Sequence, residues 1–375
     1  MLAVDPPPIE DISGTHLPVL PEDMPWTYLD EGAANVVYRI HTRPVTRPGD
    51  ASKVASRPAD RALDQVVPLH LRPFEGKLLR LRKNLPTTIP ADVSHRQWLQ
   101  LIAPMFPPEH LVHQQLVHLK PSGIVKQMNE DLKRRDQASA INGPLKSKQP
   151  LRPAKRRGVY LADDNYGLLV SDMTSECRKQ VVREFKPKWL LQSPSAPRDS
   201  VRCRTCATTA QRDAARQRAG EPVKSSPFCP LDLTSRDPAV LVRVAVQILE
   251  AGPNSQTAKQ FAKWLQECNL MHHLRHMQES MDRKGVFEAD PKDKNFLVAM
   301  TLRDCSIFMC VPDDENASIE ARMGDLDLKS PDKIKYWRET EQALIDGGWY
   351  TGTEVAQDRQ PNIVCALSPT RRAGV

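Results

Sequence analysis

The order of the predicted elements is the feature that most constrains the fold of this 375-residue chain. Runs of β-branched, aromatic and leucine residues, which favour strands, come first, at 24–40, 76–83, 166–173 and 181–189. Helical patterns follow in the second half, around a buried hairpin expected at 296–311. Strands that precede helices, instead of alternating with them, predict an α+β fold. We expect two lobes, with the ligand in a cleft between them.

The later helices have clear boundaries. Asp237 is a predicted N-cap, and Pro238 suits the first position of a helix that carries one apolar stripe. A second helix is expected at about 257–268. The last clear helix follows Ser330, its predicted cap, and ends at Gly347-Gly348.

Polar segments divide the chain. The stretches 41–75 and 192–227 are predicted to be long exposed insertions, and the basic stretch 120–158 is predicted to be a mobile loop. The expected organisation is an N-terminal tail at 1–23, an N-terminal lobe at 24–170 and a C-terminal lobe at 171–375.

Composition excludes some classes of protein. A hydrophobic content of 40% permits a real core, which a disordered chain would lack. No run approaches the roughly 20 apolar residues that span a bilayer, so no membrane partner is expected. The start of the chain has neither the basic nor the apolar part of a secretory signal. Eight cysteines then fit a reducing compartment, which indicates the nucleus or the cytoplasm, and we expect a monomer.

The charge balance indicates anionic partners. A net charge of +7 and a pI near 9.0 suit nucleic acid, acidic membranes or polyphosphate ligands. A basic surface without a specialised partner is the alternative.

Two aspartates near the end of the chain are candidates for chemistry. Asp304 and Asp325 each lie beside an apolar, strand-like stretch that can fix a carboxylate at the edge of a sheet. Phosphoryl transfer from ATP requires one carboxylate that orients a hydroxyl and one that holds a divalent metal. Acidic residues also end many strands, so turn or cap roles for both residues remain open.

A turn of small residues is a candidate phosphate loop. It comprises Gly32, Ala33, Ala34 and Asn35, whose size lets backbone N–H groups approach an anion. The turn lacks the glycine-rich and Walker patterns of nucleotide sites, so a plain hairpin turn is the alternative. Arg80 on the following predicted strand can pair with phosphates or remain a solvated charge.

Three charged residues alternate along the predicted strand 181–189. Glu184, Lys186 and Lys188 lie two apart and would therefore share a face. Pro187 between the lysines is unfavourable in a sheet interior. The row therefore suits a rim that faces solvent or a charged ligand.

Three cysteines resemble part of a metal site. Cys203 and Cys206 have the spacing of a zinc-ligand pair, and Cys229 follows, but a structural zinc site needs four ligands. Cys177 or a histidine is a candidate for the fourth. Reduced cysteines in a surface segment are the alternative.

Taken together, several stretches resemble inositol-pentakisphosphate 2-kinase in its fungal form. They are Glu31–Tyr38, Glu184–Trp189, Phe228–Leu233, Arg303–Ile307 and Asp325–Lys329, and they occur in the family's order. The resemblance covers about residues 24–350 and implies a two-lobed architecture like that of inositol phosphate kinases and protein kinases. It also implies transfer of the ATP γ-phosphate to the 2-hydroxyl of inositol 1,3,4,5,6-pentakisphosphate, which gives inositol hexakisphosphate.

The resemblance implies a role for each matching residue. Asp304 is expected to orient and deprotonate the 2-hydroxyl, and Asp325, assisted by Asp327, to hold Mg²⁺. The residues expected on the ATP side are Gly32, Ala33, Ala34, Asn35, Arg80, Glu184 and Asp325. Those expected to hold substrate phosphates are Lys186, Lys188, Arg204, Arg212, Lys329 and Lys333, with Arg152 or Arg157 at a further position. A pentakisphosphate carries about ten negative charges, so it needs many cations converging on one site.

The chain departs from the family in places. The phosphate turn has one glycine where plant relatives have more, and the family's paired asparagines reduce to Asn254-Ser255. Plant members carry a zinc site whose ligands have no clear match here, and Cys203, Cys206 and Cys229 need not be its equivalent.

Two other functions compete with this one. A basic nucleic-acid-binding protein with a Cys-based zinc module is the first, but no helix-turn-helix, finger or RNA-recognition signature is present, and aromatic residues make up only 5%. A protein kinase is the second, but the chain lacks the His-Arg-Asp and Asp-Phe-Gly motifs.

Overall fold

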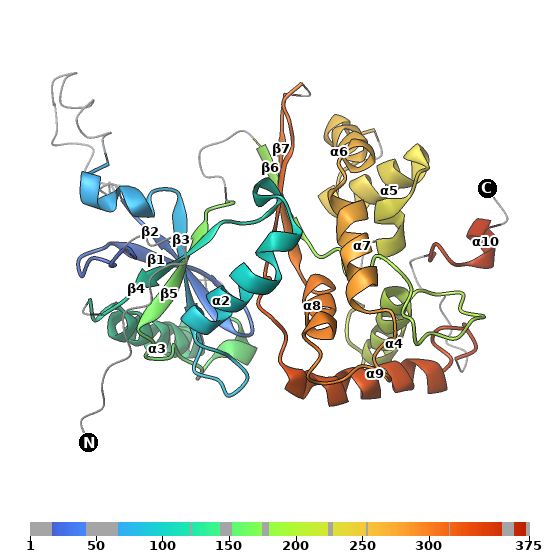
Figure 1. Cartoon of the computed structure of the whole chain (residues 1–375), viewed down its shortest axis with the longest axis horizontal. Helices are drawn as coiled ribbons and strands as arrows, with labels where there is room; N and C mark the ends of the chain where they lie inside the picture. The colour runs from blue at the N-terminus through green and yellow to red at the C-terminus, as the bar shows by residue number, and fades with distance from the viewer. Residues whose placement is uncertain are drawn as a thin grey trace. The chain divides into compact units, whose positions relative to one another are not determined.

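Strands and helices both contribute substantially to this fold, which confirms the predicted α+β class (Figure 1). The computed structural model describes residues 17–42, 67–120, 122–142, 152–174, 180–223, 228–252, 254–314, 316–354 and 364–372. The chain divides into two units, Met1–Gln97 with His113–Asp172 and Trp98–Val112 with Met173–Val375. The cleft expected between two lobes stays a prediction.

A five-stranded antiparallel sheet forms the first unit, in the order β1-β2-β3-β5-β4. Its strands are β1 (Trp26–Glu31), β2 (Asn35–Ile40), β3 (Lys77–Arg82), β4 (Gln114–His118) and β5 (Tyr166–Ser171). The strands predicted within 24–40, 76–83 and 166–173 are therefore confirmed. Of the insertion predicted at 41–75, residues 43–66 lie outside the described part of the chain.

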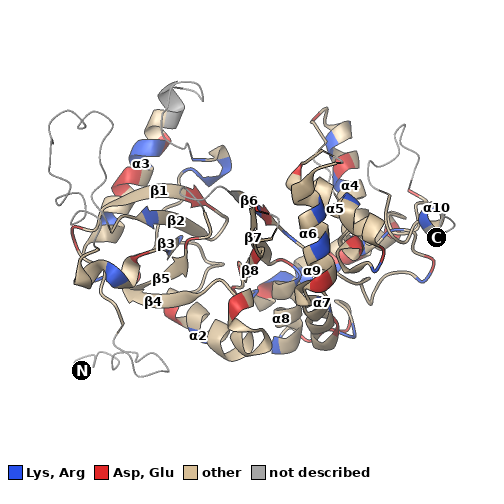
Figure 2. Ribbon diagram, turned by 90° about the horizontal axis from the view of Figure 1, so that it is seen from above, with Lys and Arg blue, Asp and Glu red and all other residues tan. Residues whose placement is uncertain are grey.

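A helix covers one face of this sheet, and it corrects the loop predicted at 120–158. Helix α3 (Ile124–Asn142) buries Ile124, Met128 and Leu132 in the same cluster as Tyr38. These residues recur every four positions, the period of a helix face. Charged residues of both signs lie between them along the helix and obscure the pattern (Figure 2). They pair along the exposed side, as Lys133 does with Glu130 at 2.9 Å.

The second unit contains a three-stranded antiparallel sheet in the order β6-β7-β8. The strands are β6 (Gln180–Phe185), β7 (Ser306–Pro312) and β8 (Glu320–Gly324). The hairpin predicted at 296–311 is wrong, because helix α8 (Lys294–Leu302) precedes β7 there. Every residue from Phe296 to Leu302 is buried, and a continuous apolar run does not distinguish a buried helix from a buried strand.

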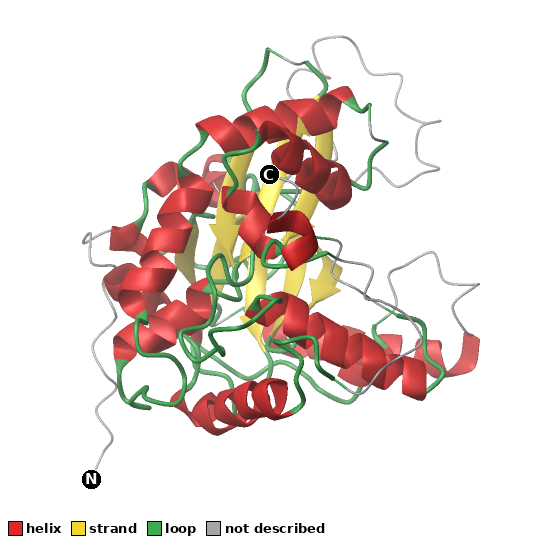
Figure 3. Ribbon diagram, turned by 90° about the vertical axis from the view of Figure 1, so that its right-hand side faces the viewer, coloured by secondary structure: helices red, strands yellow, loops and turns green. Residues whose placement is uncertain are grey.

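Helices and long loops make up most of the second unit (Figure 3). The helices are α4 (Arg204–Arg218), α5 (Pro238–Leu249), α6 (Gln256–Glu267), α7 (Leu270–Met281), α9 (Ile334–Asp346) and α10 (Pro369–Arg372), and α2 (Ala91–Leu101) crosses the boundary between the units. Short 3₁₀ helices lie at Leu69–Phe74 (η2), Ala103–Met105 (η3), Pro108–His110 (η4), Ala154–Arg156 (η5), Pro230–Thr234 (η6) and Pro331–Lys333 (η7). None of the helices in the described ranges is long and apolar enough to span a bilayer.

The predicted caps are confirmed in two places. The Asp237 side chain accepts a hydrogen bond from the Ala239 amide at the start of α5. The Ser330 side chain accepts one from the Asp332 amide, and it caps the 3₁₀ turn η7, which runs directly into α9. The 192–227 insertion, by contrast, contains helix α4, which the sequence analysis missed. Its buried face consists largely of small residues, so its hydrophobic pattern is weak although alanine favours helix formation.

Candidate functional site

The three strands of the second unit bring the predicted catalytic segments to one edge of the sheet. Phe185 pairs with Ile307, and Ser306 pairs with Gly324, so the end of β6, the start of β7 and the end of β8 coincide. Residues just beyond these ends are neighbours because antiparallel strands run back and forth across the sheet. Lys186, Asp304 and Asp325 thus meet although more than a hundred residues separate the first from the others.

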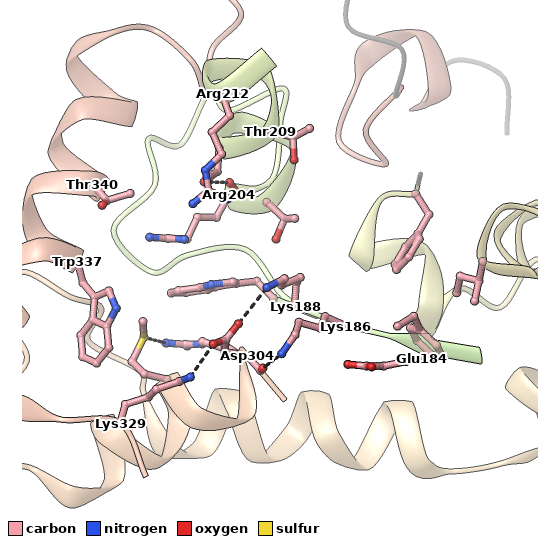
Figure 4. Close-up of a pocket in the computed structure, with 18 of the residues that line it drawn as sticks. Glu184, Lys186, Lys188, Arg204, Thr209, Arg212, Asp304, Lys329, Trp337 and Thr340 are labelled. Carbon is pink, nitrogen blue, oxygen red and sulfur yellow. Dashed lines mark hydrogen bonds and ion pairs between the residues drawn. The ribbon is translucent and has the colours of Figure 1, made fainter. Parts of the chain in front are cut away.

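A cavity of about 710 Å³ lies beside this edge, within the second unit (Figure 4). All six cations predicted to hold substrate phosphates line it, together with two of the predicted acids: Lys186, Lys188, Arg204, Arg212, Lys329, Lys333, Glu184 and Asp304. Arg204, Thr208 and Arg212 are spaced four apart on α4 and present one helix face to the cavity.

The Asp304 carboxylate is held between two ammonium groups. Lys188 Nζ donates to its Oδ1 at 3.0 Å, and Lys329 Nζ donates to its Oδ2 at 2.6 Å. Lys186 Nζ donates to the Asp304 backbone carbonyl at 2.9 Å. Burial would raise the pKa of the Asp304 carboxyl, but the charges of Lys329 and Lys188 hold that pKa well below its ordinary value. The site therefore presents a carboxylate anion to the cavity.

The backbone after β6 corrects the strand predicted over 181–189. The strand ends at Phe185, before Pro187, and Lys188 adopts a left-handed conformation with φ of 56°. A non-glycine residue rarely takes this conformation, and such residues concentrate at functional sites. Glu184, Lys186 and Lys188 do line one cavity, but a turn in the backbone brings the last lysine there instead of strand alternation.

Two carboxylates converge on a single hydroxyl at the sheet edge. Ser306 Oγ lies 2.7 Å from Glu184 Oε1 and 3.0 Å from Asp325 Oδ2. A serine hydroxyl donates one proton, so it satisfies one of these oxygens at a time. The Asp325 side chain is 51% exposed and has Lys186 Nζ at 3.4 Å. This chemistry fits a hard divalent cation, which prefers carboxylate oxygen.

The role predicted for Asp327, assistance at the metal, stays a prediction. Its backbone carbonyl accepts from Thr301 Oγ1 at 3.5 Å. Neither Asp325 nor Asp327 is among the residues that line the cavity. Within the described ranges, a trio of carboxylates close enough to enclose a metal ion is not found, so a cation at Asp325 would need further oxygen ligands from water or a bound phosphate.

Arg204 is positioned by residues that the sequence analysis missed. Its Nε donates to Glu341 Oε2 at 2.7 Å, and its guanidinium lies 4.5 Å from the centre of the Trp189 ring. Glu341 is fully buried and also accepts from Ser193 and Tyr350. Glu341 lies 137 positions from Arg204, so no local sequence pattern could reveal the pair.

Arg303, next to Asp304, was also missed. It lines the cavity but is only 2% exposed, stacks on the same Trp189 ring at 3.8 Å, and donates to Asp282 at 2.6 Å. Burial lowers the pKa of the Arg303 guanidinium. Its role in the structure is to fix the segment that carries Asp304 and the ring that supports Arg204.

The residues predicted on the ATP side mostly lie in the first unit. The turn between β1 and β2 is a closed hairpin, in which the Gly32 amide donates to the Asn35 carbonyl at 2.9 Å. The space beside Gly32 is open, since an added Cβ would meet nothing within 4 Å. Arg80 lies on the neighbouring strand, and the Asn35 amide oxygen, turned toward it, accepts from its guanidinium at 2.6 and 3.2 Å.

A buried ion cluster supports this turn and corrects one prediction. Lys83 Nζ donates to the Gly32 carbonyl at 2.8 Å and pairs with Glu31. Arg152 makes two hydrogen bonds to Glu31, at 2.7 and 3.0 Å, and two to Asp136 at 3.0 Å. Arg152 is 1% exposed, so its guanidinium is committed to the fold and is not a substrate ligand. Arg157 is exposed in the first unit.

The structure brings the three predicted cysteines together and adds a fourth. Cys203, Cys206 and Cys229 form a buried cluster with Cys365. Cys365 lies 136 positions after Cys229, so spacing alone could not identify it. Cys177, a candidate for that place, lies outside the described residues.

These observations define a class of protein. Lys and Arg outnumber Asp and Glu around the cavity. The Asp304 carboxylate, which pairs with both Lys188 and Lys329, is held as an anion. Such a site suits a small ligand with many negative charges, next to a group that can accept a proton. The class is therefore a binding protein or enzyme for a polyanionic small molecule.

The chain belongs to the inositol-pentakisphosphate 2-kinase family, because the model of that family matches residues 28–343. It is also similar to a protein named inositol-pentakisphosphate 2-kinase from Yarrowia lipolytica (strain CLIB 122 / E 150), with 39% identity over 178 residues. This match covers 44% of the chain and 53% of the relative, so it spans about half of the relative's length. The nucleic-acid-binding alternative is not favoured.

Proposed function

We propose that this protein transfers the γ-phosphate of ATP to the 2-hydroxyl of inositol 1,3,4,5,6-pentakisphosphate, giving inositol hexakisphosphate. The observation that carries the proposal is the Asp304 carboxylate, which Lys188 and Lys329 hold at 3.0 and 2.6 Å in a cavity lined by cations. Family membership supports the same substrate class.

The cavity's charge suits the proposed substrate. A pentakisphosphate brings about ten negative charges, which water would otherwise solvate, so its binding depends on converging cations. The six predicted cations come from separate segments, and the α4 face adds the hydroxyls of Thr205, Thr208 and Thr209. The cations can therefore pair with the substrate phosphates, and the threonine hydroxyls can donate hydrogen bonds that orient the phosphates.

Asp304 is proposed to accept the proton of the reacting hydroxyl. In the free protein both its oxygens are occupied by Lys188 and Lys329. Substrate phosphates attract the same ammonium groups, so binding weakens these two contacts and leaves carboxylate oxygen available to the hydroxyl. A positioned carboxylate that aligns and deprotonates the attacking hydroxyl is the standard requirement of phosphoryl transfer to an alcohol.

Asp325 is proposed to hold Mg²⁺, with Glu184 next to it and Asp327 assisting. The support is the pair of carboxylates that share the Ser306 hydroxyl at 2.7 and 3.0 Å. Magnesium usually binds through one or two carboxylates together with phosphate oxygens and water. When bound, it would neutralise charge that develops on the transferred phosphoryl group.

The β1–β2 turn and Arg80 are proposed to contact ATP phosphates. The support is the open space beside Gly32 and the hydrogen bond from Lys83 Nζ to the Gly32 carbonyl, which fixes the turn. Backbone N–H groups of small residues can approach an anion closely. Arg80, held by Asn35, offers a fixed guanidinium on the adjacent strand.

One experiment tests the proposed function. The protein is incubated with ATP, Mg²⁺ and inositol 1,3,4,5,6-pentakisphosphate, and the products are separated by ion-exchange chromatography. We expect inositol hexakisphosphate to form in proportion to ADP. A pentakisphosphate isomer that already carries the 2-phosphate serves as the matched control and should accept little phosphate. Folded wild-type protein that yields no hexakisphosphate would contradict the proposal.

A further inference from the structure

A fully buried polar side chain lies behind the cavity without lining it. Gln278 on α7 is 0% exposed, and it belongs to the buried face of that helix together with Leu270, Met271 and Leu274. A buried amide is costly unless its oxygen and its N–H groups are hydrogen-bonded. The partners of these groups therefore show what Gln278 does in the fold.

The Gln278 amide joins two backbone segments that are far apart in the sequence. Its Nε2 donates to the Lys188 carbonyl at 2.9 Å and to the Leu302 carbonyl at 3.2 Å. Its Oε1 accepts from the Leu190 amide at 3.0 Å. The two carbonyls can only accept and the Leu190 amide can only donate, so the side-chain amide satisfies all three groups in one orientation. A carboxylate or an apolar side chain would leave at least two of them without this partner.

The first segment carries a lysine that pairs with the proposed base. Lys188 has a φ of 56°, a conformation that persists in a non-glycine residue only where the surroundings hold it. Gln278 holds the chain on both sides of Trp189, through the Lys188 carbonyl before it and the Leu190 amide after it. The Trp189 ring in turn supports the Arg204 guanidinium at 4.5 Å. The contacts of one amide therefore help to fix two of the cations that line the cavity.

The second segment carries the proposed base itself. Leu302 ends α8, so its carbonyl is one of those that a helix leaves without an intrahelical donor. This carbonyl accepts from Gln278 and also from Cys305 Sγ, a weak donor, at 3.2 Å. Asp304 lies two residues further on, and its carboxylate meets Lys188 Nζ at 3.0 Å (Figure 4). Gln278 thus connects, outside the cavity, the two segments whose side chains meet inside it.

We propose that Gln278 is a positioning residue for phosphoryl transfer, which sets the distance and direction between Lys188 and Asp304. It does not line the cavity, so it acts through these two residues and not on the substrate. When substrate phosphates attract the Lys188 ammonium group, the held backbone keeps lysine and carboxylate in register with the reacting hydroxyl. The inference rests on the proposed function, which gives Lys188 and Asp304 their roles.

Gln278→Met tests the proposal, because methionine keeps nearly the same length and volume but donates no hydrogen bond. We expect kcat/KM for inositol pentakisphosphate to fall between about tenfold and a hundredfold, since misplacing a group by about 1 Å can cost a hundredfold. The fall should include a higher KM for inositol pentakisphosphate, while KM for ATP changes less than about twofold. Partial unfolding would lower only the apparent kcat, so two unchanged KM values would overturn the proposal.

Gln260→Met is the matched control. Gln260 lies on α6, and its Nε2 also donates to two backbone carbonyls, those of Asp314 at 3.3 Å and Ala317 at 3.2 Å. These bonds are exposed, and Gln260 does not line the cavity. The variant should keep wild-type constants. A loss as large as that of Gln278→Met would show that the effect is not specific to the segments of Lys188 and Asp304, and the proposal would fail.

A double-mutant cycle with Lys188→Met distinguishes positioning from general stabilisation. The cycle is measured on the Kd of inositol pentakisphosphate, by calorimetry without ATP, so it does not depend on turnover. Gln278→Met should raise this Kd several-fold in the wild-type background and less than about twofold in the Lys188→Met background, because residues that act through one another do not have additive effects. An equal rise in both backgrounds would overturn the proposal.

Hydrogen–deuterium exchange on the wild type decides if Gln278→Met does not fold. The Leu190 amide donates to Gln278 Oε1 from a stretch outside any helix or strand. It should exchange in substrate-free protein about as slowly as the Leu274 amide in the middle of α7. Exchange as fast as that of an exposed loop amide would overturn the proposal. Wild-type protein that binds inositol pentakisphosphate but forms no hexakisphosphate would instead refute the proposed function, and the calorimetric cycle would still decide whether Gln278 positions Lys188.

Discussion

Lys329 and Asp304 form a close ion pair in the cavity, with Nζ and Oδ2 separated by 2.6 Å. Lys188 pairs with the other oxygen of Asp304, so both oxygens of the proposed base are ion-paired before substrate binds. A carboxylate with so low a pKa is a weak proton acceptor in the free protein. It becomes a stronger one when substrate phosphates draw the two ammonium groups away, which couples base strength to substrate binding.

Asp304→Asn should lower kcat at least about a hundredfold, because a positioned acid–base group contributes at least that much to the rate. Binding of inositol pentakisphosphate, measured by calorimetry, should be retained, since Lys188 and Lys329 become freer to hold phosphate. Asp346→Asn makes the same chemical change at an exposed site on α9 and is the control. Near-normal turnover by Asp304→Asn would remove this residue from the role of base.

The depressed pKa of Asp304 predicts a stability effect of defined sign. The folded pKa lies below the unfolded value, which is about 3.9 for aspartate. Asp304 therefore contributes stability that is fully present above about pH 4 and is lost as the pH falls toward the folded pKa. The free energy of unfolding of the wild type, relative to Asp304→Asn, should stay constant from pH 7 to about pH 5 and shrink as the pH falls below about 4 in ligand-free urea titrations. A constant difference would show that the two lysines do not stabilise the anion.

The residues that meet at the sheet edge could be predicted from the sequence because they flank regular elements. Lys186, Asp304 and Asp325 border strands whose apolar character is visible locally, and the order of these motifs resembles one family. The pairing of these strands is then sufficient to bring the three residues together. The caps at Asp237 and Ser330 were predictable for a similar reason, since each depends on a side chain and an amide two positions away.

Local sequence patterns do not reveal elements or contacts whose determining partners are distant or whose hydrophobic pattern is weak. Cys365 joins the cysteine cluster from 136 positions away, and Glu341 meets Arg204 across 137 positions. Helix α4 buries mostly alanines, and α8 is buried on every side, so neither shows the one-sided stripe that marks a surface helix. Arg152 looked like a surface cation because its partners Glu31 and Asp136 are likewise remote.

Lys333 and Lys335 provide a matched pair of cations two positions apart. Lys333 lines the cavity, whereas Lys335 does not line it and pairs with Glu339 on the exposed side of α9. Lys333→Met should raise KM for inositol pentakisphosphate about tenfold, because losing a hydrogen bond to a charged group costs about 1.5 kcal/mol. KM for ATP should not change. Lys335→Met should leave both constants near wild type, and equal effects of the two substitutions would mean that only overall charge matters.

Asp325→Asn should raise the Mg²⁺ concentration for half-maximal activity at least about tenfold, the lower end of what losing a metal-site contact costs. The physical reason is that the variant keeps the size of the side chain and its contact with Ser306 but loses the charge that attracts the cation. The measurement is a magnesium titration of turnover at saturating ATP and inositol pentakisphosphate. Asp332→Asn, an exposed change near the N-terminus of α9, is the control and should leave the titration unchanged. An unaltered curve for Asp325→Asn would place the magnesium ion elsewhere, and Glu184→Gln would then be the next variant to titrate.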